Sequence, residues 1–174
     1  NTRTISFQQT FLGIPVWRAG VNVRMYKDSR AIISSSSSVY KQVNLSYLGF
    51  SKNPSNDPKA KVAFKHLSKL IDNANESIEK RLREIAKNSR SKLIKIEHQH
   101  LVIFRYDKLE RIENHGHVHE NKESSSPVLN LKDEQNIEDG SFRLCKEVFC
   151  ALEMPTLGNI NWRIIIDVET GQVL

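Results

Sequence analysis

Between residues 60 and 85 the apolar side chains recur at helical spacing, and this feature restricts the fold more than any other. Residues three and four apart share one face of a helix. Asp57 can accept hydrogen bonds from the first turn and Pro58 suits the first helical position, so a helix is predicted to begin there. A polar middle at 72–76 leaves open one long helix or a helical pair. The predicted apolar stripe consists of Ala60, Ala63, Phe64, Leu67, Leu70, Ile71, Ala74, Ile78, Leu82 and Ile85.

The chain before this helix alternates apolar and polar residues with the period of a strand. A first strand carries Ile5 and Phe7, and a break at 13–15 separates it from a second strand that begins near Val16 and includes Val21, Val23 and Met25. A third strand is predicted from Ala31 to Tyr40 after a polar turn. Its serine run at 34–38 is either a flexible linker or a solvated edge strand, and the strand is favoured.

More strands are predicted after the helix. One carries Leu93, the apolar run 101–104 and Tyr106. Two others, Phe142–Leu152 and Trp162–Val168, are joined by a turn at 155–161, and a final turn covers 169–172. An exposed acidic insertion at about 113–141 precedes them. The predicted class is α+β, with antiparallel sheets and one long helix or a helical pair between them. The polar boundary at 52–57 divides the chain into 1–52 and 53–174.

The net charge of +6 conceals an asymmetry. Residues 1–111 carry 21 basic and 9 acidic side chains, whereas the remainder carry 5 and 11. The basic residues form no run of five, and no aromatic ladder accompanies them, so a nucleic-acid partner is not predicted. No apolar run approaches the roughly 18 residues that a membrane span needs, so a membrane partner is not predicted either.

Histidines are the only residues that suggest a metal. His115, His117 and His119 alternate in one stretch, and His98 and His100 flank Gln99. A catalytic zinc needs three ligands held in fixed geometry. The first group lies in the polar insertion, and the helical His-Glu-x-x-His signature is absent. We therefore expect a solvated loop, with no metal site and no cofactor.

Cys145 and Cys150 lie five residues apart on a predicted strand, so their side chains should point to opposite faces. A disulfide between them is not expected, because its Cβ atoms would have to approach to about 4 Å. Two buried free thiols are predicted. No nucleophile elbow or phosphate-binding glycine loop occurs in the chain. The sequence therefore predicts no catalytic residues and no enzyme activity.

Two stretches resemble the propeptides of thermolysin- and fungalysin-like zinc metalloproteases. Residues 8–17, Gln-Gln-Thr-Phe-Leu-Gly-Ile-Pro-Val-Trp, resemble the motif of the FTP module of that family, which has two alternating strands after it. Residues 162–174, Trp-Arg-Ile-Ile-Ile-Asp-Val-Glu-Thr-Gly-Gln-Val-Leu, resemble the closing hairpin of a PepSY module. The sequence departs from the family at Asp28-Ser29-Arg30, where a glycine is usual, and in its long acidic insertion. The motif residues are Gln8, Gly13, Pro15, Val16, Trp162, Asp167, Thr170 and Gly171.

The resemblance implies a fold and a function. It implies an FTP-like β-rich module at 1–52 and a cystatin- or PepSY-like α+β module at 53–174. It implies a non-catalytic propeptide that acts as intramolecular chaperone and inhibitor of a secreted zinc metalloprotease, whose catalytic domain belongs to the same precursor. Gln172, Val173 and Leu174 would then face this partner, in a secreted or extracytoplasmic setting. The end of the chain just past a strand favours an excised piece of a longer protein. The alternative is a stand-alone exported PepSY-like module that regulates another protein.

Overall fold

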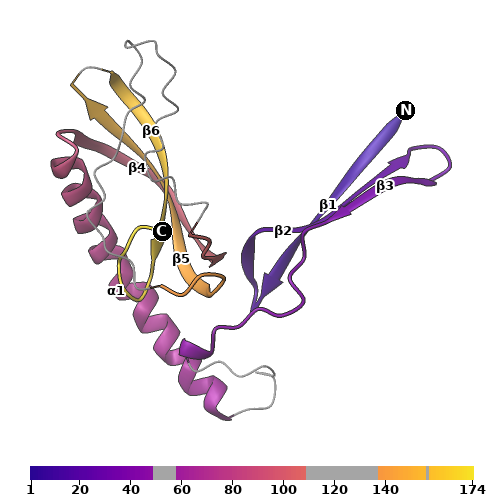
Figure 1. Cartoon of the computed structure of the whole chain (residues 1–174), viewed down its shortest axis with the longest axis horizontal. Coiled ribbons are helices and arrows are strands. Elements are labelled where there is room, and N and C mark those ends of the chain that lie inside the picture. The colour runs from indigo at the N-terminus through magenta and orange to yellow at the C-terminus, as the bar shows by residue number, and fades with distance from the viewer. Residues whose placement is uncertain (49–57, 109–136, 156) are drawn as a thin grey trace.

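The protein is an α+β structure with one six-stranded sheet and one long helix (Figure 1). This computed structural model describes residues 1–48, 58–108, 137–155 and 157–174. A short 3-10 helix, Ser46–Leu48, precedes the helix α1 (Pro58–Asn88). The strands are β1 (Thr2–Phe11), β2 (Ile14–Tyr26), β3 (Ile32–Ser37), β4 (Lys92–Arg105), β5 (Phe142–Met154) and β6 (Gly158–Asp167).

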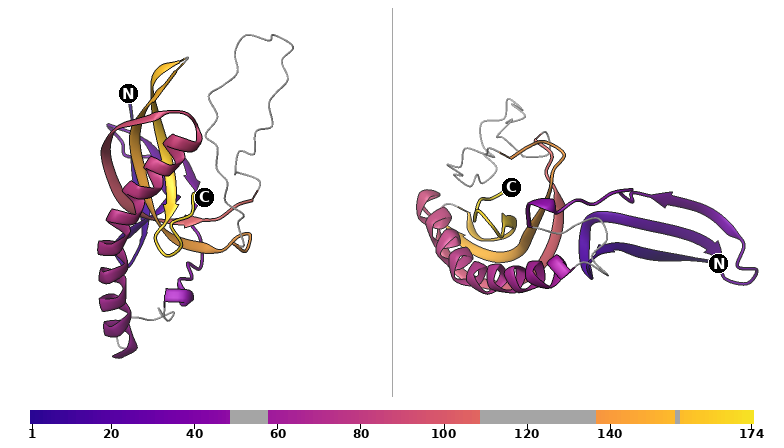
Figure 2. Two further views of the ribbon diagram at one scale, coloured as in Figure 1. Left: turned by 90° about the vertical axis from the view of Figure 1, so that its left-hand side faces the viewer. Right: turned by 90° about the horizontal axis from the view of Figure 1, so that it is seen from below.

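The sheet has the strand order β1-β2-β4-β5-β6, and β3 also pairs with β2. Every pairing is antiparallel except that of β2 with β4, which is parallel and rests on Val16 opposite Ile103. The strands β4, β5 and β6 form a body on which α1 lies, whereas β1, β3 and the outer part of β2 project away from it (Figures 1 and 2). We call this projecting part, residues 1–8 and 20–37, the arm. The strand β2 therefore belongs to both parts.

The helix is single and uninterrupted, which decides between the two alternatives left by the sequence. It begins at Pro58 as predicted, while Asp57 and the side chains of Ala60, Ala63 and Phe64 lie outside the described part. Leu67, Ala74, Ile78, Leu82 and Ile85 are buried, each at most 7% exposed, so the apolar stripe faces the sheet. Arg90, with φ of 52°, ends the helix in the left-handed conformation, and the Ser91 amide donates to the Ala86 carbonyl at 2.8 Å.

Two apolar clusters lie on the two faces of the sheet. The larger joins α1 to the body and includes Val16, Ile103, Val148 and Ile166, all fully buried. The smaller, on the opposite face, contains Val102, Phe104, Tyr106, Cys145 and Ile165. Side chains alternate along β6, because Trp162, Ile164 and Ile166 share the first cluster and Ile165 lies in the second.

Several predicted boundaries were wrong. The serine-rich segment is a strand, but it ends at Ser37, and the hydroxyl of the next residue, Ser38, donates to the Arg18 carbonyl at 2.7 Å. Pro15 lies inside β2, not in a break. The turn predicted at 155–161 is shorter, because residues 158–161 already pair with β5. Most of the predicted acidic insertion, residues 113–136, lies outside the described residues.

The predicted modules share one hydrophobic core. Leu45 and Leu48, from the first module, are buried at 2% and 5% exposure in the same cluster as α1. The predicted boundary at 52–53 itself lies outside the described residues. Among the described helices, none has the length and apolar character to traverse a lipid bilayer.

Candidate interaction surface

The first motif of the resemblance forms the turn and brace of the β1–β2 hairpin. Leu12 and Gly13, with φ of 54° and 78°, form a two-residue turn in which both positions are left-handed, a combination that glycine accommodates readily. The amide of the Gln8 side chain donates to the carbonyls of Val16 and Ala19, the latter at 3.0 Å. Gln8 therefore holds the irregular stretch of β2 against β1, where the pairing register shifts.

This irregular stretch directs neighbouring residues of β2 into both faces of the sheet. Val16 is fully buried in the helix-side cluster, and Trp17 packs on the opposite cluster. Arg18 follows with φ of 52°, and Ala19 returns to the helix-side cluster at 2% exposure. Such a bulge bends a strand and increases its twist. It lies where the arm leaves the body.

Trp17 fixes this junction through contacts with the body. The Arg163 guanidinium on β6 lies 4.1 Å from the centre of the Trp17 ring, within the range of a cation–π interaction. The Trp17 and Phe104 ring centres are 6.2 Å apart. Contacts from β2 to β4 and β6 therefore hold the base of the arm on the face opposite α1.

A buried carboxylate positions Arg163. The Glu147 side chain on β5 is 3% exposed and pairs with Arg163 through one oxygen and with His100 on β4 through the other. His98 completes the row, with its ring centre 4.4 Å from that of Phe149. His98 and His100 share one face because they lie two residues apart on β4, and there His100 contacts Glu147 and His98 contacts Phe149. This row links three strands of the body by charge and ring stacking.

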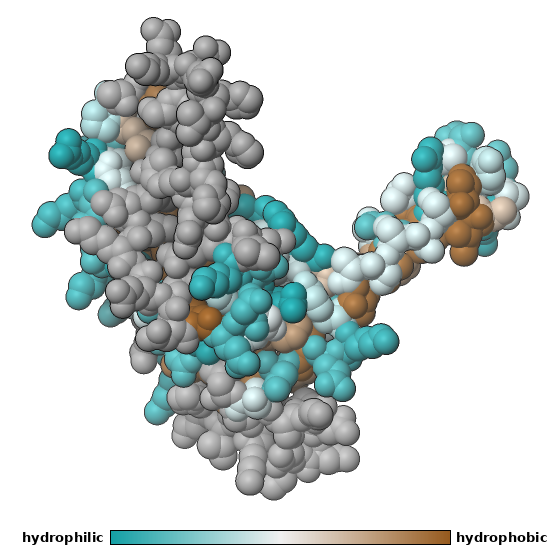
Figure 3. Space-filling model, in the orientation of Figure 1, coloured by the Kyte–Doolittle hydropathy of each residue, from teal (hydrophilic) through white to brown (hydrophobic). Residues whose placement is uncertain are grey.

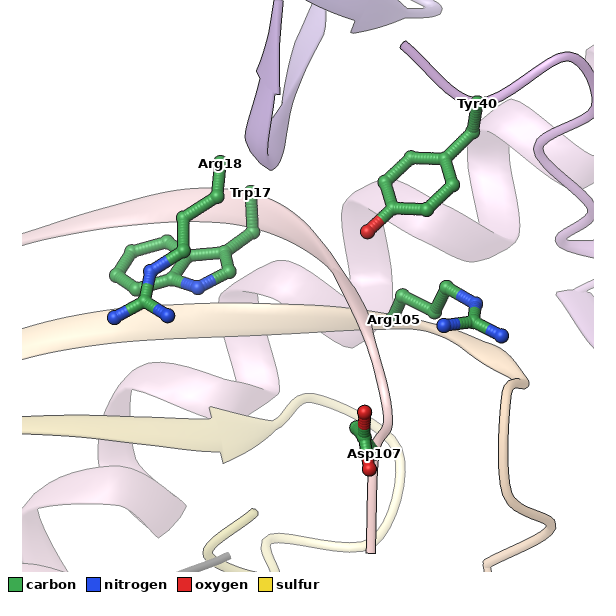
Figure 4. Close-up of a pocket in the computed structure, with 5 residues that line it drawn as sticks. All are labelled: Trp17, Arg18, Tyr40, Arg105 and Asp107. Atoms are coloured by element: carbon green, nitrogen blue, oxygen red, sulfur yellow. The ribbon is translucent and has the colours of Figure 1, made fainter. Parts of the chain in front are cut away.

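A small cavity of about 110 Å³ lies at the junction, lined by Trp17, Arg18, Tyr40, Arg105 and Asp107. In Figure 4 the Tyr40 ring faces Arg105, and its centre is 5.8 Å from that guanidinium. Organic ligands of drug size fill pockets of about 300–1,000 Å³. This cavity is therefore too small for such a ligand.

The second motif of the resemblance forms a fixed turn at the end of β6. Asp167 is fully buried, and its Oδ1 accepts the amides of Glu169 and Thr170, both at 2.8 Å. Its Oδ2 accepts a hydrogen bond from Arg143 Nε at 2.6 Å, while Arg143 Nη2 donates to the Glu169 carboxylate at 2.7 Å. Gly171 has φ of 71°, a conformation that favours glycine. One carboxylate thus organises the whole turn. Trp162, the other motif residue, is half-buried in the helix-side cluster.

The predicted partner-facing residues turn back along β6. The Gln172 carbonyl accepts the Asp167 amide at 2.8 Å, Val173 forms an antiparallel bridge with Ile166, and the Leu174 amide donates to Ile165 at 3.0 Å. The Val173 side chain is 5% exposed in the protein's own core. The part of this segment that another protein can contact is therefore its outer backbone edge and the half-buried Gln172 and Leu174.

Within the described ranges, no three His, Cys, Asp or Glu side chains cluster in a way that would hold a metal ion. His115, His117 and His119 lie outside these ranges.

Both cysteines are buried free thiols on opposite faces of β5, as predicted. Burial raises the pKa of the Cys150 thiol from its ordinary 9.0 to about 11, with a smaller contribution from Glu97. Burial, followed by the nearby Asp167 carboxylate, raises the pKa of Cys145 well above its ordinary value. At neutral pH both groups stay protonated, a form that makes a poor nucleophile.

We expect neither cysteine to react with iodoacetamide in the folded protein at pH 8. With a pKa of about 11, only roughly a thousandth of Cys150 is thiolate at that pH, and burial blocks access as well. Mass spectrometry of the alkylated protein measures this, and the same reaction in denaturant should label both thiols. Rapid labelling of either cysteine in the folded state would contradict the assignment.

Sequence reasoning missed several residues of this surface. Gln9 forms two hydrogen bonds with the backbone of Tyr40, both at 2.9 Å, which attach the segment after β3 to the end of β1. Glu147 and Arg163 each interrupt an apolar run on a predicted strand. Strand alternation could have placed both side chains on the same face of the sheet, and the sequence offered no other indication of their contact. Arg143 carried no signal beyond its charge.

No known family model matches the chain, and no curated protein was found to be similar to it.

Proposed function

We propose that this chain is a non-catalytic propeptide, with a cystatin- or PepSY-like body, that assists folding of a secreted zinc metalloprotease and inhibits it. The supporting observation is the placement of the two motifs. They lie at opposite ends of the sequence, yet both form braced turns in a single sheet, one at the base of the arm and the other at the end of β6. This is the arrangement expected if an FTP-like and a PepSY-like module act together.

The proposed mechanism depends on the strand edges. In the described part, β6 pairs along its outer edge only with the short segment at Val173. An extended segment of a partner can add to such an edge through main-chain hydrogen bonds. The Asp167 turn directs the C-terminal segment along this edge. A sheet that is already folded would also speed the folding of a partner whose native contacts join distant parts of its chain, because such a protein folds slowly by itself.

Two assays on one preparation test this proposal. The intact 174-residue chain is added to a mature thermolysin-like catalytic domain, namely the one encoded after residue 174 where the gene carries it. We expect it to raise the yield of active protease after refolding from denaturant, and to inhibit peptide hydrolysis by the folded enzyme in a saturable way.

An unrelated small α+β protein at the same concentration serves as the control for non-specific chaperone effects. If the chain alters neither refolding nor hydrolysis, the proposal is wrong, and the stand-alone binding module becomes the better hypothesis. A gene in which no His-Glu-x-x-His domain accompanies the chain would point the same way.

A further inference from the structure

The arm has one apolar face and one polar face. Residues directly opposite one another in a sheet point to the same side. Phe7 is opposite Val21, Ile5 is opposite Val23, and Met25 is opposite Ile32. The other side carries polar groups, among them Thr4 opposite Arg24 and Ser6 opposite Asn22. Six apolar residues, Ile5, Phe7, Val21, Val23, Met25 and Ile32, form what we call the apolar face, and on β3 it is bordered by Ser35 opposite Val23 and Ser37 opposite Val21.

This apolar face is uncovered in the described structure. Phe7 is 59% exposed and Ile32 is 69% exposed, and none of the six side chains is buried. Hydrophobic atoms are visible on the surface of the arm in Figure 3. The contrast lies within one strand, because Ala19, two residues before Val21, is 2% exposed in the core. The face therefore extends the core surface beyond the reach of α1 (Figure 1).

The charge of the arm restricts what covers this face. The arm contains four basic side chains and a single acidic one, Asp28. Arg3 lies on the apolar face itself, opposite Met25. Two copies brought face to face would place like charges together, which opposes association. A partner with carboxylates around an apolar centre would complement the arm instead.

The strand edges favour a protein over a membrane or a nucleic acid. Among described residues β1 pairs only with β2, and β3 likewise, so both outer edges of the arm are open. Open edges are not tolerated in the hydrocarbon of a bilayer, where their backbone groups stay unsatisfied. The face carries one aromatic ring, Phe7, whereas single-stranded nucleic acids bind to several stacked rings.

We propose that the apolar face of the arm is a docking surface for an acid-rimmed apolar patch on the partner protein. The inference rests on the proposed function for the identity of that partner, the metalloprotease catalytic domain. The interface has an apolar centre formed by the six side chains, with Arg3 at its rim. The body and its β6 edge form a second, separate contact.

The test compares variants on the two faces of the arm in the intact chain. Phe7→Ser with Ile32→Ser removes two highly exposed apolar side chains, so folding should be unaffected, which far-UV circular dichroism checks. Tyr26→Ser is the matched control: Tyr26 is 51% exposed on the same arm but lies opposite Thr2 on the polar face. The probe is the mature catalytic domain used above, and binding is measured by calorimetry or surface plasmon resonance.

We expect the double variant to weaken binding at least about tenfold, as for loss of central interface residues, and Tyr26→Ser to leave it within about twofold. Arg3→Glu should slow association at low salt, with the effect shrinking as salt screens the charge. If the wild-type chain binds and the double variant binds equally well, the docking surface is wrong while the proposed function stands. If the wild-type chain does not bind at all, both fail.

Two further measurements test whether a membrane or a second copy of the chain covers the apolar face instead. Sedimentation of vesicles containing phosphatidylserine should leave the chain in solution, and analytical ultracentrifugation should show no self-association that depends on Phe7 and Ile32. Vesicle binding or dimer formation that the double variant abolishes would overturn the proposal.

Discussion

Replacing Asp167 by alanine is expected to lower the free energy of unfolding by about 3–5 kcal/mol, the usual loss when one partner of a buried ion pair is removed. Asp167 is fully buried, and it accepts two backbone amides and the Arg143 side chain. Its removal leaves Arg143, whose side chain is 15% exposed, without its buried counterion. Urea unfolding followed by circular dichroism measures the change.

Two companion variants make this result specific. Asp167→Asn retains an oxygen for the Glu169 and Thr170 amides and loses only the charge, so we expect a smaller destabilisation. Glu169→Ala removes the other carboxylate that contacts Arg143, but Glu169 is 43% exposed, and the expected loss is at most about 1 kcal/mol. If the Asp167 and Glu169 alanine variants lowered the free energy of unfolding equally, burial of the carboxylate would not explain its contribution to stability.

Leu82→Ala is expected to cost about 2–5 kcal/mol, through lost burial and the cavity left behind. Leu82 is 1% exposed in the cluster between α1 and the sheet. The adjacent Arg83 provides the control, because its side chain is 67% exposed and, among the described residues, pairs only with the exposed Glu79 at 2.6 Å. Arg83→Ala should change stability by less than about 0.5 kcal/mol. If Leu82→Ala and Arg83→Ala lowered stability equally, the apolar stripe of α1 would not be the side that packs on the sheet.

The helix and most strands could be predicted because their signals are local. The stripe from Leu67 to Ile85 repeats at the helical period, and the period of a strand places Trp162 and Ile164 on one face and Ile165 on the other. Alternation in β1 and β2 likewise indicated an apolar face. It could not indicate that the face is uncovered, because the period of a strand reports which side is apolar and not what packs against it.

The junction of arm and body was not predictable for a different reason. Trp17 lies far along the chain from Glu147 and Arg163, and the contacts of all three depend on strand order and register. The bulge at Arg18 carries no sequence signal of its own, since a left-handed arginine is not a residue preference. The parallel pairing of β2 with β4 was also missed, because local pattern predicts strands and not their neighbours.

That parallel pairing has a consequence for how the protein forms. Val16 and Ile103 lie half the chain apart, whereas β5 and β6 are joined by a tight turn, so closing the first contact costs far more chain entropy. The β5–β6 hairpin should form early, and the β2–β4 contact should close last. During synthesis the order of appearance is the reverse, because the N-terminal strands leave the ribosome first. The first three strands must therefore remain soluble while the rest of the sheet is still being made, and the hydroxyl-rich β3 along one border helps to keep them from joining other nascent chains.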